Sequence, residues 1–255
     1  MKGRVTRYRA VLAYDGTEYL GFQRQAGDTP TIQGAVEAAL RQVTQQETTV
    51  IGAGRTDTGV HASGQVIAFD AAWPHEPGAL WRAVNANLPD AVALQSLEEA
   101  AANFHPRFDA RSRTYSYTLY FAPVRQPLWQ RTAWHATHRS PALDAMRQAA
   151  AGLVGTHDFA TFGQPPQGEQ TVREVFRSDI ALVDRPEASC CVLRYEIEAN
   201  AFLYRMVRRI VGGLARVGRG DLTAEDFLTA FRAADGTWPN PSAPAHGLCL
   251  TRVTY

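Results

Sequence analysis

The order in which strand-like and helix-like segments follow one another is the feature that most limits the fold of this chain. Residues 6–14 alternate in polarity and end at a turn at Asp15-Gly16, which predicts a first strand. Thr31 is suited to cap a helix whose apolar face is formed by Ile32, Val36, Ala39, Leu40 and Val43. The pattern then predicts strands at 48–52 and 65–70, a helix over 77–87 and a strand at 91–97. This βαββαβ order is typical of a ferredoxin-like fold.

The second half repeats the order without repeating the sequence. Its predicted segments are strand 114–121, helix 141–153, strands 171–183 and 190–198, helices 201–217 and 223–233, and strand 248–254. We therefore predict an α+β protein of two ferredoxin-like halves with antiparallel or mixed sheets, residues 1–105 and 106–255. The halves are expected to flank a central active-site cleft, since clefts between domains commonly hold sites. The irregular interval 122–140 predicts an inserted strand or a loop.

Composition excludes several classes of protein. The N-terminus lacks the apolar core of a signal peptide and no run is long enough to cross a bilayer, so we expect no membrane association. The three cysteines lack metal-ligand spacing, which predicts reduced thiols and a cytoplasmic protein. A net charge of +1 does not indicate a nucleic-acid binder, although 26 basic residues gathered on one surface would still make a phosphate site.

A glycine-rich segment, residues 51–65, places Arg55 and Asp57 at the tip of a connection between two predicted strands. A phosphate-binding P-loop would need lysine after its last glycine, and a dinucleotide fingerprint would need glycine at position 57, so the segment is neither motif. Composition alone leaves two interpretations equal. One is an active-site loop with an acid beside a base, and the other is a hairpin turn whose Asp and Thr bond their own backbone.

Resemblance favours the active-site loop. The segment Gly54-Arg-Thr-Asp-Thr-Gly-Val-His61 resembles the signature of the tRNA pseudouridine synthase A family. Further blocks resemble that family in the same order, at residues 14–25, 84–89, 104–108, 115–117, 200–208 and 247–250. Two positions depart from its pattern, with Phe22 where tryptophan is expected and Pro106 where alanine is expected.

The resemblance implies a tRNA pseudouridine synthase that isomerises uridine at positions 38, 39 and 40 of the anticodon stem-loop. It implies a homodimer that binds tRNA and uses no metal, no nucleotide cofactor and no other cofactor. By the same resemblance Asp57 is the catalytic nucleophile, and attack on C1′ of the ribose or on C6 of the uracil both remain open. Tyr115 is the active-site tyrosine that stacks on the target uracil and is a candidate for removing the C5 proton, a role that does not extend to Tyr117.

Arginines gather on one side of the helix predicted over 201–217. At about 100° per residue, one sector holds Arg205, Arg208, Arg209, Arg216 and, if the helix extends that far, Arg219. Most charged helix faces are simply solvated, but this helix carries no acid to form the usual i,i+4 pairs. We therefore predict that Arg205, Arg209 and Arg216 bind phosphates of the RNA.

Two arginines receive separate roles. Arg208 ends the block Met206-Val-Arg208, which resembles the family segment with the active-site arginine, so we expect it to pair with Asp57 and keep that carboxylate charged. Arg55 is expected to fill the position vacated by the flipped nucleotide or to hold a phosphate.

Two alternatives belong to other classes of protein. A non-catalytic RNA-binding protein with two RRM-like halves would share the βαββαβ order, but the sequence has no RNP1 motif. An Asp-dependent nuclease or glycosidase would need a metal or a second carboxylate, and neither is evident. The only closely spaced histidines, His135 and His138, lack an identifiable third ligand, so no metal site is predicted.

Overall fold

The computed structural model describes residues 4–137, 140–165, 168–183, 190–236 and 241–255. The chain divides into two compact units, which are considered separately below. Unit 1 comprises Met1–Arg111 with the C-terminal segment Leu250–Tyr255, and unit 2 comprises Ser112–Cys249. The final strand, β10 (Leu248–Thr254), therefore begins in unit 2 and ends in unit 1.

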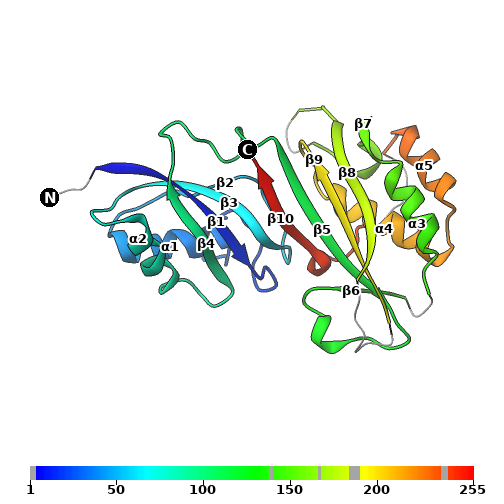
Figure 1. The fold of residues 1–255 in the computed structure, drawn as a ribbon, viewed down its shortest axis with the longest axis horizontal. Coiled ribbons are helices and arrows are strands. Elements are labelled where there is room, and N and C mark those ends of the chain that lie inside the picture. The colour runs from blue at the N-terminus through cyan, green and yellow to red at the C-terminus, as the bar shows by residue number, and fades with distance from the viewer. Residues whose placement is uncertain (1–3, 138–139, 166–167, 184–189, 237–240) are drawn as a thin grey trace. The chain divides into compact units, whose positions relative to one another are not determined.

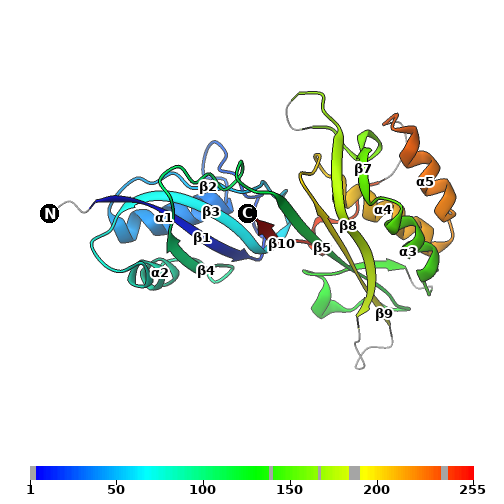
Figure 2. The same ribbon diagram turned by 45° about the horizontal axis from the view of Figure 1, so that its top comes forward.

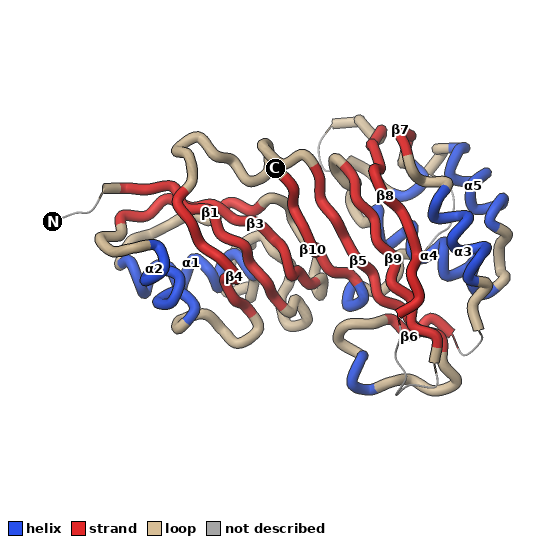
Figure 3. The backbone as a smooth tube through the Cα atoms, in the orientation of Figure 1, coloured by secondary structure: helices blue, strands red, loops and turns tan. Residues whose placement is uncertain are grey.

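Unit 1 contains the predicted order of elements. These are β1 (Val5–Tyr14), α1 (Ile32–Thr44), β2 (Ile51–Gly52), β3 (His61–Ala72), α2 (Pro77–Asn85) and β4 (Val92–Glu99). β1 lies between β4 and β3 (Figure 3) and is antiparallel to both. The short β2 pairs with β3. The strand predicted at 48–52 is therefore confirmed only over its last two residues.

The alternation predicted for β1 is confirmed. Tyr8, Ala10, Leu12 and Tyr14 are buried while the side chains between them are partly exposed, so one face of the strand forms core. The predicted cap is confirmed as well, because Thr31 Oγ1 accepts a hydrogen bond from the Gly34 amide at 3.2 Å.

Unit 2 also follows the predicted order, with additions. Its strands are β5 (Ser112–Phe121), β6 (Trp134–Thr137), β7 (Gly155–Asp158), β8 (Val172–Val183) and β9 (Cys191–Ala199), and its helices are α3 (Leu143–Ala151), α4 (Met206–Arg219) and α5 (Ala224–Ala233). Short 3-10 turns occur at Pro127–Trp129, Ala160–Phe162 and Ala245–Gly247. β9 lies between β5 and β8, and β7 follows at the edge of β8.

Helices α3, α4 and α5 lie on one side of these strands in both views of the chain (Figures 1 and 2). The buried rings of Phe159, Phe162, Phe227 and Phe231 pack together beneath α5, with centroids between 4.9 and 6.5 Å apart. The α+β class predicted from the sequence is thus confirmed.

The irregular interval 122–140 contains an inserted strand, one of the two alternatives that the sequence left open. β6 pairs in parallel with the end of β5, and Tyr120, Ala122, Ala133 and Val192 form a small core cluster there. His138, the second member of the predicted histidine pair, lies outside the described residues.

Candidate active site

The loop that carries Asp57 connects β2 to β3 in unit 1. Arg55 and Thr58 are exposed at its tip, Asp57 is half-buried, and Thr56 between them is buried. The Val60 amide donates to the Asp57 carbonyl at 3.1 Å, which closes a tight turn. Gly59 adopts a left-handed backbone with φ of 75°, a conformation that glycine reaches without steric cost. Asp57 and Arg55 therefore both lie at the tip of the connection, as predicted from the sequence.

Thr56, the residue before Asp57, is held from two directions by the end of β1 and the segment after it. The Tyr14 hydroxyl lies 2.8 Å from Thr56 Oγ1, and both residues are buried, with exposures of 4% and 6%. The Phe22 amide donates to the Thr56 carbonyl at 3.0 Å. Gly21 has φ of 95°, and a Cβ there would lie 2.9 Å from the same carbonyl oxygen. The backbone entering Asp57 is therefore fixed by these contacts, and the Tyr14–Thr56 bond and the close approach of Gly21 depend on the residue type.

The far end of the loop is held by Gly16 and His61. The Gly16 amide donates to His61 Nδ1 at 3.1 Å, and His61 is buried. A Cβ on Gly16 would overlap the carbonyl oxygen of Val60, so only glycine permits this approach. The Gly59 amide points at the Tyr19 carbonyl at 3.4 Å. Residues 14–22 thus contact the Asp57 loop on both sides of Asp57, and His61 takes part by accepting the Gly16 amide.

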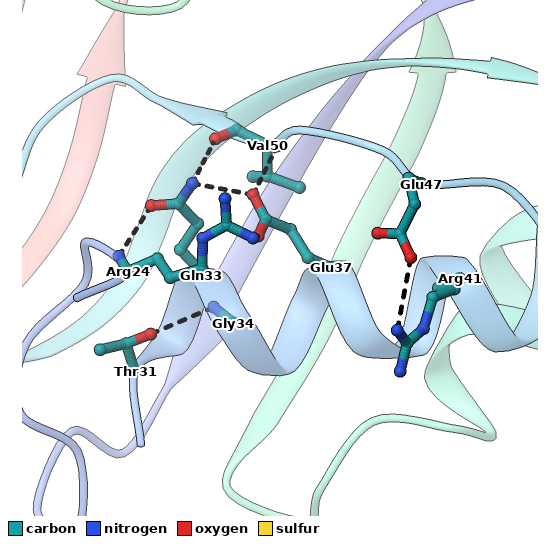
Figure 4. A network of polar contacts seen from close by, with 8 residues as sticks. All are labelled: Arg24, Thr31, Gln33, Gly34, Glu37, Arg41, Glu47 and Val50. Atoms are coloured by element: carbon teal, nitrogen blue, oxygen red, sulfur yellow. Dashed lines mark hydrogen bonds and ion pairs between the residues drawn. The ribbon is translucent and has the colours of Figure 1, made fainter. Parts of the chain in front are cut away.

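A buried carboxylate holds the strand that leads into the loop. Glu37 on α1 is only 8% exposed, and its Oε1 accepts from the Val50 amide at 3.0 Å and from Gln33 Nε2 at 2.8 Å (Figure 4). The same Gln33 amide donates to the Val50 carbonyl at 3.2 Å, and the Arg24 guanidinium lies 3.1 Å from Glu37 Oε2. Both backbone groups of Val50 are therefore fixed by α1, which aligns β2 and the loop after it.

The Tyr14–Thr56 hydrogen bond gives the first prediction. Tyr14→Phe keeps the buried ring and removes the hydroxyl, so Thr56 loses its side-chain partner and the Asp57 loop gains freedom. If Asp57 has the catalytic role that the resemblance implies, we expect turnover to fall by roughly 10- to 100-fold with little change in KM, since small displacements of a catalytic group are costly. Tyr8→Phe on the same strand, also buried, is the matched control. Steady-state kinetics alongside thermal melts test this, and equal turnover in the two variants would make Tyr14 a packing residue only.

In unit 2, Tyr115 and Tyr117 have different environments on β5. Tyr117 is completely buried, and its hydroxyl donates to the Pro244 carbonyl at 2.8 Å. Burial raises the pKa of the Tyr117 phenol, and the nearby Arg208 cation offsets part of that rise. Tyr115 is only partly buried, with its ring edge-to-face against Phe202 at 5.0 Å. Tyr117 is thus a packing residue, while Tyr115 keeps accessible surface.

The start predicted for the helix over 201–217 is wrong, because the helix begins later in the chain. α4 starts at Met206, and Arg205 before it adopts a left-handed conformation with φ of 58°. The Ala201 amide bonds to the Asn200 side chain, and the Tyr204 amide donates to the Gln164 carbonyl at 2.9 Å, so residues 201–204 are held outside the helix. Arg205 therefore does not belong to the helical row, and its guanidinium lies 5.0 Å from the Tyr204 ring centroid.

The remaining arginines of α4 are half-buried rather than fully solvated. Arg208, Arg209, Arg216 and Arg219 are each of intermediate exposure on a helix that is otherwise largely buried. Arg208 Nε donates to the Ala243 carbonyl at 2.7 Å, and Arg219 Nε lies 2.8 Å from Asp221 Oδ2. The sequence showed no acid on the helix itself, but Arg219 has an acidic partner, Asp221, just beyond the end of the helix.

The predicted site residues are divided between the units. Arg55 and Asp57 belong to unit 1, and the others belong to unit 2, namely Tyr115, Arg205, Arg208, Arg209 and Arg216. Sequence reasoning missed the supporting residues Tyr14, Thr56 and Glu37. The sequence marked residues 14–25 only as a block that resembles the family. Nothing in that block indicates that Tyr14 contacts residue 56.

No helix in the described part of the chain is both long and apolar enough to span a bilayer. Among the same residues, no three His, Cys, Asp or Glu side chains are gathered as metal ligands would be.

Comparison with known proteins identifies the family. A family model described as tRNA pseudouridine synthase matches residues 10–109 and 149–255, which is most of the chain. The chain belongs to this tRNA pseudouridine synthase family. The matched segments of the synthase contain the Asp57 loop and all of α4, whereas Tyr115 lies between them.

Relatives named tRNA pseudouridine synthase A match nearly the whole chain. The protein from Neisseria gonorrhoeae (strain ATCC 700825 / FA 1090) is 40% identical over 251 residues, which cover 98% of this chain and 92% of the relative. The protein from Brevibacillus brevis is 42% identical over 253 residues, covering 98% and 99%. The protein from Chloroflexus aurantiacus (strain ATCC 29366 / DSM 635 / J-10-fl) is 41% identical over 248 residues, covering 96% and 87%.

Membership of the synthase family makes the chain an isomerase that converts uridine to pseudouridine. The family resemblance seen in the sequence is confirmed. The alternative, a non-catalytic RNA-binding protein with two RRM-like halves, is not favoured, because the chain belongs to a family of enzymes.

Proposed function

We propose that this synthase acts on the anticodon stem-loop of tRNA and isomerises the uridines at positions 38, 39 and 40. The observation that carries the proposal is the clasped loop of unit 1, which holds Asp57 half-buried and Arg55 exposed beside it in a chain of this family. The named relatives, tRNA pseudouridine synthases A, support tRNA as the substrate.

In the proposed reaction Asp57 is the nucleophile. The bond between N1 of uracil and C1′ of ribose breaks, the base turns, and a bond between C5 and C1′ forms. The hydrogen on C5 leaves as a proton and N1 gains one, so the product is an isomer of the substrate. Asp57 attacks either C1′ or C6, and both routes pass through a covalent intermediate. Because the target base is stacked in the stem, the nucleotide is flipped out, and Arg55 occupies the vacated space or holds a phosphate.

The target positions are tested with tRNA transcripts that carry uridine at only one of the three positions. We expect pseudouridine at 38, 39 or 40 in the matching transcript, mapped by chemical tagging and primer extension. A transcript with uridine elsewhere in the stem is the control. Modification outside these positions, with none inside them, would overturn the proposed specificity while leaving the isomerase activity intact.

Tyr115 is proposed to stack on the uracil and to remove the C5 proton. Tyr115→Phe should then bind tRNA normally and slow only the steps after N1–C1′ cleavage. Tyr117→Phe is the matched control, because it loses a buried hydrogen bond and should cost about 1 kcal/mol of stability without a step-specific defect. Single-turnover kinetics that separate base detachment from C5 hydrogen release distinguish the two variants. A wild-type rate of hydrogen release in Tyr115→Phe would remove its proposed chemical role.

The arginines of unit 2 are proposed to fall into two groups. Arg205, Arg209 and Arg216 bind phosphates, so Arg209→Ala or Arg216→Ala should weaken binding to any tRNA and reduce the salt slope by about one unit per lost contact. Arg208 is proposed to pair with Asp57. Arg208→Ala should therefore lower turnover with little change in slope, and Arg208→Lys should recover part of it. Filter binding of tRNA over a salt series, together with turnover measured on the same variants, tests both groups. Equal slope changes in all variants would place Arg208 among the phosphate contacts.

We also propose a homodimer located in the cytoplasm. The three cysteines, Cys190, Cys191 and Cys249, form no disulfide with one another, which suits a reducing compartment. Sedimentation equilibrium tests the dimer, and a monomer at micromolar concentration would contradict it. Recovery of the protein in a secreted or membrane fraction would contradict the location.

A further inference from the structure

The turn between β4 and β5 displays the most exposed aromatic ring of the described chain. Phe108 is 75% exposed, whereas the other exposed rings, Tyr204 and Phe176, are 52% and 47% exposed. A single exposed phenylalanine is ordinary on a protein surface, so the case for Phe108 as a contact rests on how its ring is held and on the charge beside it.

The Phe108 ring is held in place rather than left free. The His105 imidazole stacks against it at 4.2 Å with an interplanar angle of 28°. His105 Nδ1 faces the amides of Arg107 and Phe108 at 3.2 Å each. The His105 amide donates to Asp109 Oδ2 at 2.9 Å, and the Asp109 amide donates back to the His105 carbonyl at 3.1 Å. One face of the ring is thus supported, and much of the entropy of ordering it is lost before any ligand arrives.

The base of the turn is anchored to unit 1. The Tyr255 hydroxyl donates to the Pro106 carbonyl at 2.8 Å, and the Phe104 and Tyr255 rings lie 5.2 Å apart. Arg7 donates to the Phe104 carbonyl through Nε and Nη2 at 3.1 and 3.0 Å. The turn therefore presents Phe108 from a fixed base.

A guanidinium cation lies beside the ring. The Arg107 guanidinium lies 5.8 Å from the Phe108 centroid, and Arg107 and Arg111 are both exposed. The neighbouring carboxylate, Asp109, is directed toward the His105 amide. A flat aromatic face beside arginines is the arrangement that binds unpaired nucleobases, with stacking on the ring and the cation near the backbone. The centre of a protein interface would instead be a broader apolar patch with few charges.

We propose that Phe108, supported by His105 and flanked by Arg107, is a stacking site for an unpaired nucleobase of the substrate RNA. The proposal rests on the proposed tRNA substrate and adds a contact outside the Asp57 loop. It predicts a preference for RNA that offers an unpaired base, and it predicts that the ring contributes affinity rather than chemistry.

The test compares binding of an anticodon stem-loop RNA and of a fully paired RNA duplex by full-length wild type, Phe108→Leu and Phe108→Tyr. Phe108→Leu keeps apolar volume and loses the π face, so stem-loop affinity should fall about tenfold, while duplex affinity should not change. Phe108→Tyr should bind like wild type. Phe176→Leu, another exposed phenylalanine, is the matched control and should have no effect.

Turnover on tRNA and sedimentation are measured on the same samples. If wild type isomerises tRNA but Phe108→Leu binds the stem-loop as tightly, the stacking site is overturned and the proposed function stands. If wild type neither binds nor isomerises tRNA, both fail. Dissociation of an oligomer in Phe108→Leu, with equal RNA affinity per subunit, would show a protein contact and would also overturn the stacking site.

Discussion

Asp57→Asn is expected to abolish pseudouridine formation while tRNA affinity stays near that of wild type. The amide has the size of the carboxylate and can occupy the same half-buried position after Thr56, but it lacks the oxygen anion that the proposed reaction requires. The clasp made by Tyr14, Gly16 and Phe22 bonds to the neighbours of Asp57, so it should persist in the variant. Single-turnover assays and filter binding on the same preparation measure the two properties.

Asp90→Asn provides the matched control for this variant, because it removes an exposed carboxylate from unit 1 and should leave both properties unchanged. Residual turnover of Asp57→Asn above roughly a tenth of the wild-type rate would be too high for loss of a nucleophile and would remove Asp57 from that role.

Gly16→Ala is expected to have the second large effect, on stability and turnover together. The added methyl group would overlap the backbone carbonyl of Val60, which cannot swing away as a side chain can. Either the segment after β1 or the end of the Asp57 loop must move, and the hydrogen bond from the Gly16 amide to His61 would be strained. Overpacking of this kind costs about 1–3 kcal/mol. Chemical denaturation should show that loss, and turnover should fall because the loop no longer has its clasped shape.

Gly78→Ala is the control for a glycine replacement. It lies in the first turn of α2, and the nearest atom to a new Cβ is the flexible end of Arg82 at 3.7 Å. Helix propensity should make this variant neutral or more stable by up to about 1 kcal/mol. Equal denaturation midpoints for wild type and Gly16→Ala would show that the loop accommodates the methyl group and that the clasp is not tight.

The sequence predicted correctly those helices and strands that depend on side chains close together in the chain. The alternation that ends at Tyr14 gave β1, the Thr31 hydroxyl capped α1 as expected, and β10 spans the predicted 248–254. Each depends on side chains within a few residues, where period and capping chemistry are visible in sequence.

Contacts between distant residues account for what local patterns missed. Phe202 and Leu203 fit the apolar face of a helix, yet a bond between Tyr204 and Gln164 keeps that stretch out of α4. The charge of Glu37 argues against a buried helix position, yet Glu37 is buried there because it bonds to the Val50 amide, 13 residues away and just before β2. The Tyr14–Thr56 bond likewise joins the last residue of β1 to a residue of the loop between β2 and β3. Sequence separation hides such pairs, although they hold the site in shape.

The most direct test of the account is release of tritium from tRNA labelled at C5 of uracil, with wild type and Asp57→Asn compared. Isomerisation exchanges the C5 hydrogen and leaves the RNA chain whole. We predict that wild type releases tritium in proportion to the pseudouridine formed, with intact tRNA on a denaturing gel, and that Asp57→Asn releases none. Free uracil or cut RNA from wild type, or tritium release that continues in Asp57→Asn, would contradict an isomerase whose nucleophile is Asp57.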